Sequence, residues 1–288
     1  MVDPINFAQT AIQFTDLGLD PIIFEIGPFA LRWYSLAYIG GIIVAWWYIL
    51  RMLKAPGAPA SAKHIDSFIT WITLGIILGG RLGYVLFYEP AKYLANPVDI
   101  LKVWEGGMSF HGGLLGVVIA MWGFTRSNGL SFLRFADYIA VTIPFGLGFG
   151  RLANFINGEL WGRTTDVPWG VIFPTGGDLP RHPSQLYEAI LEGLVLFVIL
   201  WWMFWKTDAR YQPGKLMGTF ALGYGAFRFF VEFYRESDSQ LVEFAASTGL
   251  HMGQWLSLPL IIGGLYFIAT AKGRRVRVEP IAGPAAQQ

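Results

Sequence analysis

The sequence predicts an all-α integral membrane protein with seven transmembrane helices. Its 288 residues are 54% hydrophobic and only 14% charged, whereas soluble domains carry about a quarter charged residues. Seven windows approach the roughly twenty apolar residues that a bilayer-spanning helix needs. Aromatic residues make up 16% of the chain, which is typical of proteins with Trp and Tyr belts at headgroup level.

The predicted spans follow one another without an internal repeat. They form a single polytopic membrane domain over residues 1–275, and the polar, Gly- and Pro-containing stretch 276–288 is predicted to be a disordered cytoplasmic tail. The seven windows are Leu31–Leu50, Ile65–Tyr88, Met108–Phe124, Phe135–Phe149, Leu186–Trp205, Leu216–Phe233 and Gln254–Ala271.

The distribution of Lys and Arg predicts the orientation, because positive charge collects on the cytoplasmic side. Alternate loops hold twelve basic residues on one side and six on the other, so the N-terminus is placed outside. The first twenty residues lack Lys and Arg, so no cleavable signal peptide is expected. The twelve are Arg51, Lys54, Lys63, Arg126, Arg134, Lys206, Arg210, Lys215, Lys272, Arg274, Arg275 and Arg277, and the six are Lys92, Lys102, Arg151, Arg163, Arg181 and Arg235.

Composition also narrows the chemistry. The net charge of +1 says nothing about nucleic acid, but the chain has no basic block long enough to follow a phosphate backbone, so no nucleic-acid partner is expected. The chain has no cysteine, which removes disulfides, thiolate metal sites and a cysteine nucleophile. We expect neither a metal ion nor a cofactor.

The first polar cluster is Gly150–Arg163, GRLANFINGELWGR. Arg151, Asn154 and Asn157 are three residues apart and share one face if the helix continues. Two interpretations are open. Arg151 pairs with Glu159 to cap a helix, or it binds an anionic headgroup, since the guanidinium fork matches phosphate.

A second cluster, GGMSFHGG, places His111 between glycine pairs that permit close approach of backbone or ligand. His111 is either a structural hydrogen-bonding residue or a general base, because the pKa of an unperturbed imidazole lies near working pH.

The third cluster, GYGAFRFFVEFYR, puts Tyr224, Arg228, Glu232 and Arg235 on one helical face. An intrahelical ion pair between Arg228 and Glu232 is one interpretation, and an anion site at Arg228 is the other.

Three signals are weaker. In RHPSQLYE, Ser184 is expected to cap a helix. Arg81 is expected either in a glycine-rich contact between helices or in a binding site, and Tyr34 lies at the start of the first span.

These clusters gather at the outer halves of the predicted spans, while the inner halves are nearly all apolar. A transport path needs polar groups along its whole length, so the pattern favours an enzyme acting at the outer leaflet. A small-solute or lipid transporter and a lipid-stabilised scaffold are the rival interpretations.

The segments GRLANFINGELWG, GGMSFHGG, RHPSQLYE and GYGAFRFFVEFYR, in this order, together with LRWYSL, resemble those of the bacterial prolipoprotein diacylglyceryl transferases. The resemblance spans nearly the whole chain. It implies a seven-helix enzyme of the bacterial inner membrane with a periplasmic active site. Such enzymes move the diacylglyceryl group of phosphatidylglycerol onto the lipobox cysteine of a prolipoprotein, forming a thioether and releasing glycerol phosphate.

The resemblance also implies roles for individual residues. His111 matches a proposed base of the family, and Arg151 and Arg228 match its important arginines. The expected substrate-binding residues are Tyr34, Arg81, Asn154, Asn157, Glu159, Gly162, Tyr224, Glu232 and Arg235.

Overall fold

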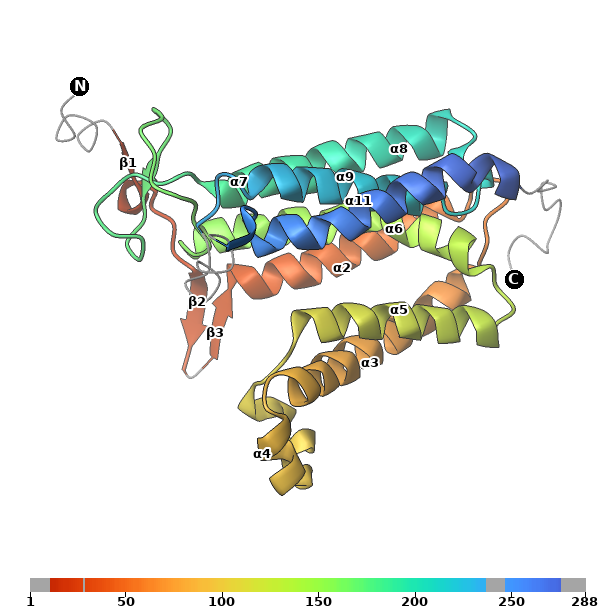
Figure 1. The fold of residues 1–288 in the computed structure, drawn as a ribbon, viewed down its shortest axis with the longest axis horizontal. Coiled ribbons are helices and arrows are strands. Elements are labelled where there is room, and N and C mark those ends of the chain that lie inside the picture. Colours follow the sequence, from red (N-terminus) through yellow and green to blue (C-terminus); the bar gives the residue numbers. More distant parts are fainter. Residues whose placement is uncertain (1–10, 28, 237–246, 276–288) are drawn as a thin grey trace. The chain divides into compact units, whose positions relative to one another are not determined.

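The computed structural model describes residues 11–27, 29–236 and 247–275, and these residues are mostly helical (Figure 1). The tail predicted over residues 276–288 lies outside them. Within the described chain, five helical segments are long and apolar enough to cross a membrane. They are α2 (Trp33–Met52), α3 (Ala62–Phe87), α6 (Phe132–Ile156), the segment Ser184–Lys206 and the segment Met252–Arg274.

Two of these segments are composite. Ser184–Lys206 contains α7 (Ser184–Glu188), a π-helical stretch (Ala189–Val195) and α8 (Leu196–Lys206), and the last segment contains α11 (Met252–Thr270) with a 3₁₀ turn (Ala271–Arg274). The two remaining predicted windows also fall on helices, α5 (Phe110–Ser127) and α9 (Lys215–Val231). Their 18 and 17 residues make them shorter than a typical span.

Smaller elements surround the long helices, so the chain is mostly helical rather than all-α. α4 (Pro90–Ala95) and two 3₁₀ turns, Pro97–Leu101 and Val103–Glu105, connect α3 to α5. Two further 3₁₀ turns cover Phe14–Leu17 and Ala209–Tyr211. Strand β1 (Ile12–Gln13) pairs in parallel with β4 (Val171–Ile172), and β2 (Ile22–Ile26) pairs antiparallel with β3 (Phe29–Arg32).

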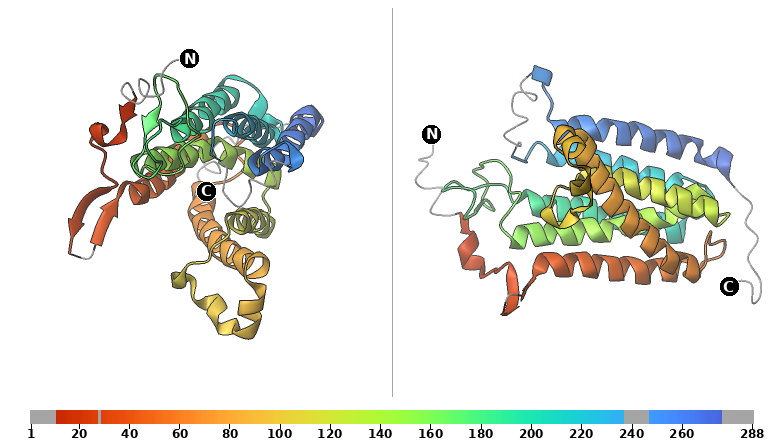
Figure 2. Two further views of the ribbon diagram at one scale, coloured as in Figure 1. Left: turned by 60° about the vertical axis from the view of Figure 1, so that its left-hand side comes forward. Right: turned by 90° about the horizontal axis from the view of Figure 1, so that it is seen from below.

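The chain forms two compact units, which are described separately. The first contains the described residues of Met1–Ile49 and Asp137–Val276, and the second contains Leu50–Ala136. In the first unit, α6, α8, α9 and α11 run side by side (Figure 2).

Close backbone contacts hold the first unit together. α6 passes through Pro144 and approaches the π-helical stretch so closely that a Cβ on Gly193 would lie 2.7 Å from the Cα of Gly148. The glycine-rich run after Pro144 has little side-chain bulk, which permits this approach. At the other end, the buried Asp137 accepts hydrogen bonds from the amides of Gly214 and Met217 at 2.7 and 2.8 Å. This carboxylate caps the N-terminus of α9.

The second unit depends on glycines between α3 and α5. A Cβ on Gly83 would lie 2.7 Å from the Cα of Gly112, and one on Gly116 would lie 2.9 Å from the Cα of Gly79. Small residues at four-residue spacing let two helix backbones touch. The helix-packing interpretation of the glycines around Arg81 is therefore confirmed.

We expect Gly116→Ala to destabilise the second unit, because the new methyl group would overlap the carbonyl of Gly75. Overpacking of this kind costs about 1–3 kcal/mol. Gly113→Ala is the matched control, since its Cβ would meet its nearest neighbour, the carbonyl oxygen of Ile76, at 3.7 Å. Thermal unfolding in detergent measures both variants. Equal unfolding temperatures for the two would contradict the packing argument.

Candidate active site

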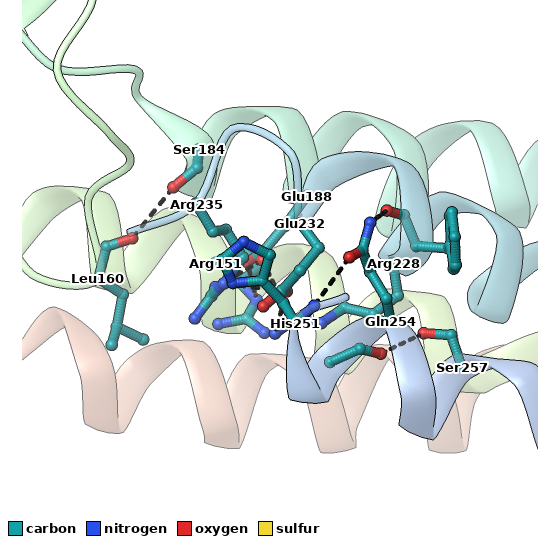
Figure 3. A network of polar contacts seen from close by, with 12 residues as sticks. Arg151, Leu160, Ser184, Glu188, Arg228, Glu232, Arg235, His251, Gln254 and Ser257 are labelled. Carbon is teal, nitrogen blue, oxygen red and sulfur yellow. Dashed lines mark hydrogen bonds and ion pairs between the residues drawn. The ribbon is translucent and has the colours of Figure 1, made fainter. Parts of the chain in front are cut away.

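One buried carboxylate organises the polar interior of the first unit. Glu188, the last residue of α7, is 0% exposed and accepts ion pairs from three arginines (Figure 3). The Nε of Arg151 lies 2.6 Å from its Oε2, and Nη1 atoms of Arg228 and Arg235 each lie 2.6 Å from its Oε1. Charge-assisted contacts of this length are among the strongest polar contacts in proteins. Glu188 thus draws together side chains from α6, α7 and the end of α9.

Glu232 is the second carboxylate of this cluster. Its Oε2 lies 3.0 Å from Nη2 of Arg228 and 3.6 Å from Nε of Arg235. The predicted Arg228–Glu232 intrahelical ion pair is therefore confirmed. Gly253 leaves room for this carboxylate, since a Cβ there would lie 2.6 Å from a carboxylate oxygen of Glu232.

Helical spacing explains how α9 supplies these groups. Arg228 lies in the last turn of α9, and Glu232 follows at the point where the helix ends. Four-residue spacing brings such side chains together on one face. Tyr224 lies one turn earlier than Arg228, with its ring stacked on Phe220 at 5.9 Å between centroids.

The Arg151 side of the site continues a helix. α6 extends to Ile156, so Arg151 and Asn154 lie one turn apart, and Nη1 of Arg151 is 3.5 Å from Oδ1 of Asn154. Asn154 and Asn157 both donate to Oε1 of Glu159, at 2.8 and 3.1 Å. The expected alternative in which Arg151 pairs with Glu159 is wrong, because its ion-pair partner is Glu188.

The loop after α6 is fixed by its backbone. The amide of Gly162 donates to the carbonyl of His182 at 2.8 Å. A Cβ on Gly162 would lie 2.8 Å from the carbonyl oxygen of His182 and would also clash with the carbonyl of Tyr234, so only glycine fits here.

Burial lowers the pKa of His182, which favours the neutral imidazole.

Ser184 does not cap α7 as expected. The N-cap position is Pro183, and the hydroxyl of Ser184 donates to the carbonyl of Leu160 at 3.2 Å. Gln185 donates to the carbonyl of Glu159 at 2.5 Å. The first turn of α7 therefore holds the loop after α6 in place, which a residue-by-residue reading of helix signals does not anticipate.

The three arginines differ in the donors they leave for a ligand. Arg228 places both terminal nitrogens on carboxylates, one on Glu188 and one on Glu232. Arg151 contacts Glu188 through Nε. Among the described contacts, its terminal nitrogens have only the long contact to Asn154. Arg235 contacts Glu188 through Nη1 and Glu232 through Nε, so only its Nη2 is left over among the described contacts. Arg151 therefore leaves the most donors for a ligand.

Of the remaining predicted site residues, His111 and Arg81 lie in the second unit and Tyr34 lies in the first. His111 lies in the first turn of α5 with an exposed side chain, and its ring packs edge-on against Phe110 at 5.6 Å. Tyr34, in the first turn of α2, belongs to the first unit and lies 3.4 Å, oxygen to oxygen, from Tyr38.

Arg81 is engaged by the second unit itself. It is 4% exposed and lies over the ring of Tyr93 at 5.0 Å. Its guanidinium donates to backbone carbonyls of the chain that follows α4, a geometry that favours a structural role over contact with substrate. The acceptors are the carbonyls of Asp99, Ile100, Lys102, Gly106 and Gly107, at 2.5, 2.8, 3.2, 2.5 and 3.2 Å.

Sequence reasoning missed the two glutamates of the fifth predicted span. Glu188 is the centre of the site, yet it was not among the predicted site residues. Glu192 is also 0% exposed, and neither of its carboxylate oxygens has a hydrogen-bond partner among the described residues. The signal was present, because ionisable residues within an apolar span are functional candidates by default.

The fold and this cluster define a class: a mostly helical protein with membrane-spanning candidate helices and three partly buried arginines around a buried glutamate. Comparison with known proteins gives the family. The family model described as "Prolipoprotein diacylglyceryl transferase" matches residues 21–270. The chain belongs to the prolipoprotein diacylglyceryl transferase family.

Curated relatives agree over nearly their full length. Each carries the name phosphatidylglycerol–prolipoprotein diacylglyceryl transferase. The protein from Zymomonas mobilis is 53% identical, with 94% of this chain and 98% of the relative covered. The relative from Erythrobacter litoralis is 50% identical with 95% and 96% covered, and the one from Rhodospirillum rubrum is 52% identical with 93% and 96% covered.

Glu188→Gln is expected to destabilise the first unit strongly, because three arginines would lose their shared counter-charge. Breaking a buried ion pair typically costs about 3–5 kcal/mol. Glu192→Gln is the matched control, since it makes the same change four residues later at a carboxyl group without a hydrogen-bond partner. Thermal and denaturant unfolding in detergent compares them. A loss of stability as large for Glu192→Gln as for Glu188→Gln would argue against the central role of Glu188.

Proposed function

We propose that the chain transfers the diacylglyceryl group of phosphatidylglycerol to the lipobox cysteine thiol of a prolipoprotein. The observation that carries the proposal is the cluster of three partly buried arginines around the buried Glu188, in a chain that belongs to the prolipoprotein diacylglyceryl transferase family. Relatives about half identical to the chain carry names that specify both substrates. Phosphatidylglycerol is a phosphate diester, and the cluster offers guanidinium donors for its phosphate.

The chemistry requires one bond to form and one to break. The cysteine sulfur attacks a glycerol carbon of the diacylglyceryl group, and the carbon–oxygen bond to phosphate breaks. The thiol proton is lost to a base, because the thiolate is the nucleophile. Glycerol phosphate leaves with the bonding electron pair. The charge that grows on its oxygen needs fixed positive groups nearby.

Arg151 is the residue we assign to the phosphate. Both of its terminal nitrogens lie outside the ion pairs of the cluster, whereas only one, Nη2, does so in Arg235. Arg228 and Arg235, held by Glu188 and Glu232, supply positive charge behind it.

Other residues support this arrangement. Asn154, Asn157 and Glu159 form a hydrogen-bonded set beside Arg151, and Gly162 fixes the loop that carries Glu159. We propose that Tyr34 and Tyr224 orient the headgroup or the arginines. Arg81 stabilises the second unit through the hydrogen bonds that its side chain donates to backbone carbonyls.

His111 is proposed as the base that takes the thiol proton. Its place in the first turn of α5, with an exposed imidazole, fits this task. The alternative is that His111 only organises hydrogen bonds and that water or another group removes the proton.

The proposed setting is the bacterial inner membrane. All seven windows predicted from the sequence fall on helices, and we propose that they form one membrane domain of seven spans. The N-terminus and the active site face the periplasm, as the Lys and Arg distribution favours.

Arg151→Lys is expected to lower the transfer rate by about 100-fold, the loss typical for a donor to a developing anion. Lysine keeps the charge but lacks the two-pronged donor geometry. Purified protein is incubated with phosphatidylglycerol and a lipobox peptide, and the diacylglyceryl adduct is measured by mass. Arg126→Lys, at an exposed site in the last turn of α5, is the control.

The same assay tests the function itself. An adduct on the peptide separates a transferase from a transporter or a scaffold, which would bind lipid without forming a product. Full activity of Arg151→Lys would remove Arg151 as the phosphate ligand. No adduct from the unmodified protein, under conditions in which phosphatidylglycerol binds, would overturn the proposed function.

His111→Gln is expected to abolish most transfer at pH 7 to 8 if His111 is the base, because glutamine cannot take the proton. The rate of adduct formation as a function of pH measures this. His64→Gln, a histidine in the first turn of α3, serves as the control. Substantial transfer by His111→Gln across this range would favour the hydrogen-bonding role.

A further inference from the structure

The stretch between α3 and α5, residues 88–109, has an unusual surface. Four of its large apolar side chains are almost fully exposed: Leu94 at 80%, Val98 at 71%, Leu101 at 72% and Trp104 at 76%. They come from α4 and the two 3₁₀ turns that follow it. Exposed apolar side chains that are this large and this close in the chain mark an interaction surface.

This surface is held in a defined conformation. The buried guanidinium of Arg81 donates to the carbonyl of Ile100, in the first 3₁₀ turn, and to the carbonyl of Gly106, the residue after the second turn. Tyr93, the buried residue of α4, lies beneath the same guanidinium. The inward-facing groups of the 88–109 segment are thus satisfied within the second unit, and its apolar side chains are left facing outward.

The segment is continuous with the apolar surface of two helices. Phe87, the last residue of α3, is 82% exposed, and Phe110, the first residue of α5, is 75% exposed. Further along α5, Leu115 is also exposed. Exposed apolar side chains are therefore found at the end of α3, in the 88–109 segment and at the start of α5.

The length of α3 sets the depth of this segment. Its 26 residues correspond to about 39 Å at about 1.5 Å per residue. The hydrocarbon core of a bilayer is about 30 Å thick, and the headgroup layers extend it to about 40–45 Å. A helix of this length that crosses the core therefore ends within a headgroup layer, where the 88–109 segment begins.

The charges of the segment fit that layer. Lys102 pairs with Asp99 at 2.7 Å, and Lys92 pairs with Glu89 at 3.7 Å. Lysine stems lie along apolar surface while their ammonium groups remain in water, and Trp is enriched at headgroup level. Paired charges beside exposed apolar side chains are typical of segments that lie in a membrane interface.

We infer that Leu94, Val98, Leu101 and Trp104 insert into the lipid interface, so that the 88–109 segment lies on the bilayer as an anchor for the second unit. The occupant of this surface is lipid. The inference goes beyond the proposed transfer reaction and uses the exposure and charge of this segment together with the length of α3, a helix long and apolar enough to cross a membrane. It also gives the glycine-packed pair of α3 and α5 a fixed depth in the membrane.

The chain contains no cysteine, so single introduced cysteines give unique labelling sites. Leu94→Cys and Leu101→Cys report on the surface, and Glu89→Cys and Lys92→Cys are the matched controls at charged, solvent-accessible positions of the same segment. Leu115→Cys in α5 supplies the value for a membrane helix. Each variant carries a nitroxide spin label in the full chain, in nanodiscs of phosphatidylcholine and phosphatidylglycerol, and thermal unfolding shows that it is folded.

Collision rates with oxygen, which concentrates in lipid, and with a water-soluble nickel chelate measure depth. We expect a several-fold higher oxygen-to-nickel ratio at Leu94 and Leu101 than at Glu89 and Lys92, approaching the ratio at Leu115. Ratios at the surface equal to those of the controls would overturn the inference. Protection that appears only after a lipobox peptide is added would also overturn it, because the surface would then bind the preprotein. No arm of this experiment uses transferase activity, so its failure is distinct from failure of the proposed function.

Discussion

The ion pairs of Glu188 with Arg151, Arg228 and Arg235 are the interaction on which the candidate site depends. A carboxylate at 0% exposure is unfavourable in a membrane protein unless it is paired, and three guanidinium groups would repel one another without it. Each partner therefore requires the others. Because these side chains come from α6, α7 and the end of α9, the same contacts that balance charge also fix how the helices of the first unit meet.

This constraint shapes the proposed chemistry. Arg228 contacts two carboxylates through its terminal nitrogens, so it contributes charge and rigidity. Arg151 keeps donors for a ligand. Preorganised donors stabilise a developing charge without a reorganisation cost at the moment of reaction. Whether an arginine of this cluster supports the site or is free to bind the ligand thus depends on its contacts and not on its residue type.

Much of the fold could be predicted because apolar windows and helical spacing are local signals. All seven windows coincide with helices, and the Arg228–Glu232 pair follows from four-residue spacing. The fourth window ended too early at Phe149, since glycine-rich sequence weakens helix signals although α6 continues to Ile156. Ser184 was misassigned as a cap because its partner, the carbonyl of Leu160, is distant in sequence.

The sequence by itself determined the class of protein, its family and the identity of the polar residues, because composition, apolar periodicity and ordered motifs are properties of the chain alone. Only the tertiary structure decided which of those residues meet. Glu188 is central because α7 packs where the side chains of Arg151 and Arg228 meet. The side chain of Arg81 binds backbone carbonyls of its own unit because these carbonyls surround the guanidinium. Long-range pairing depends on how helices pack, and a single sequence carries no direct record of that.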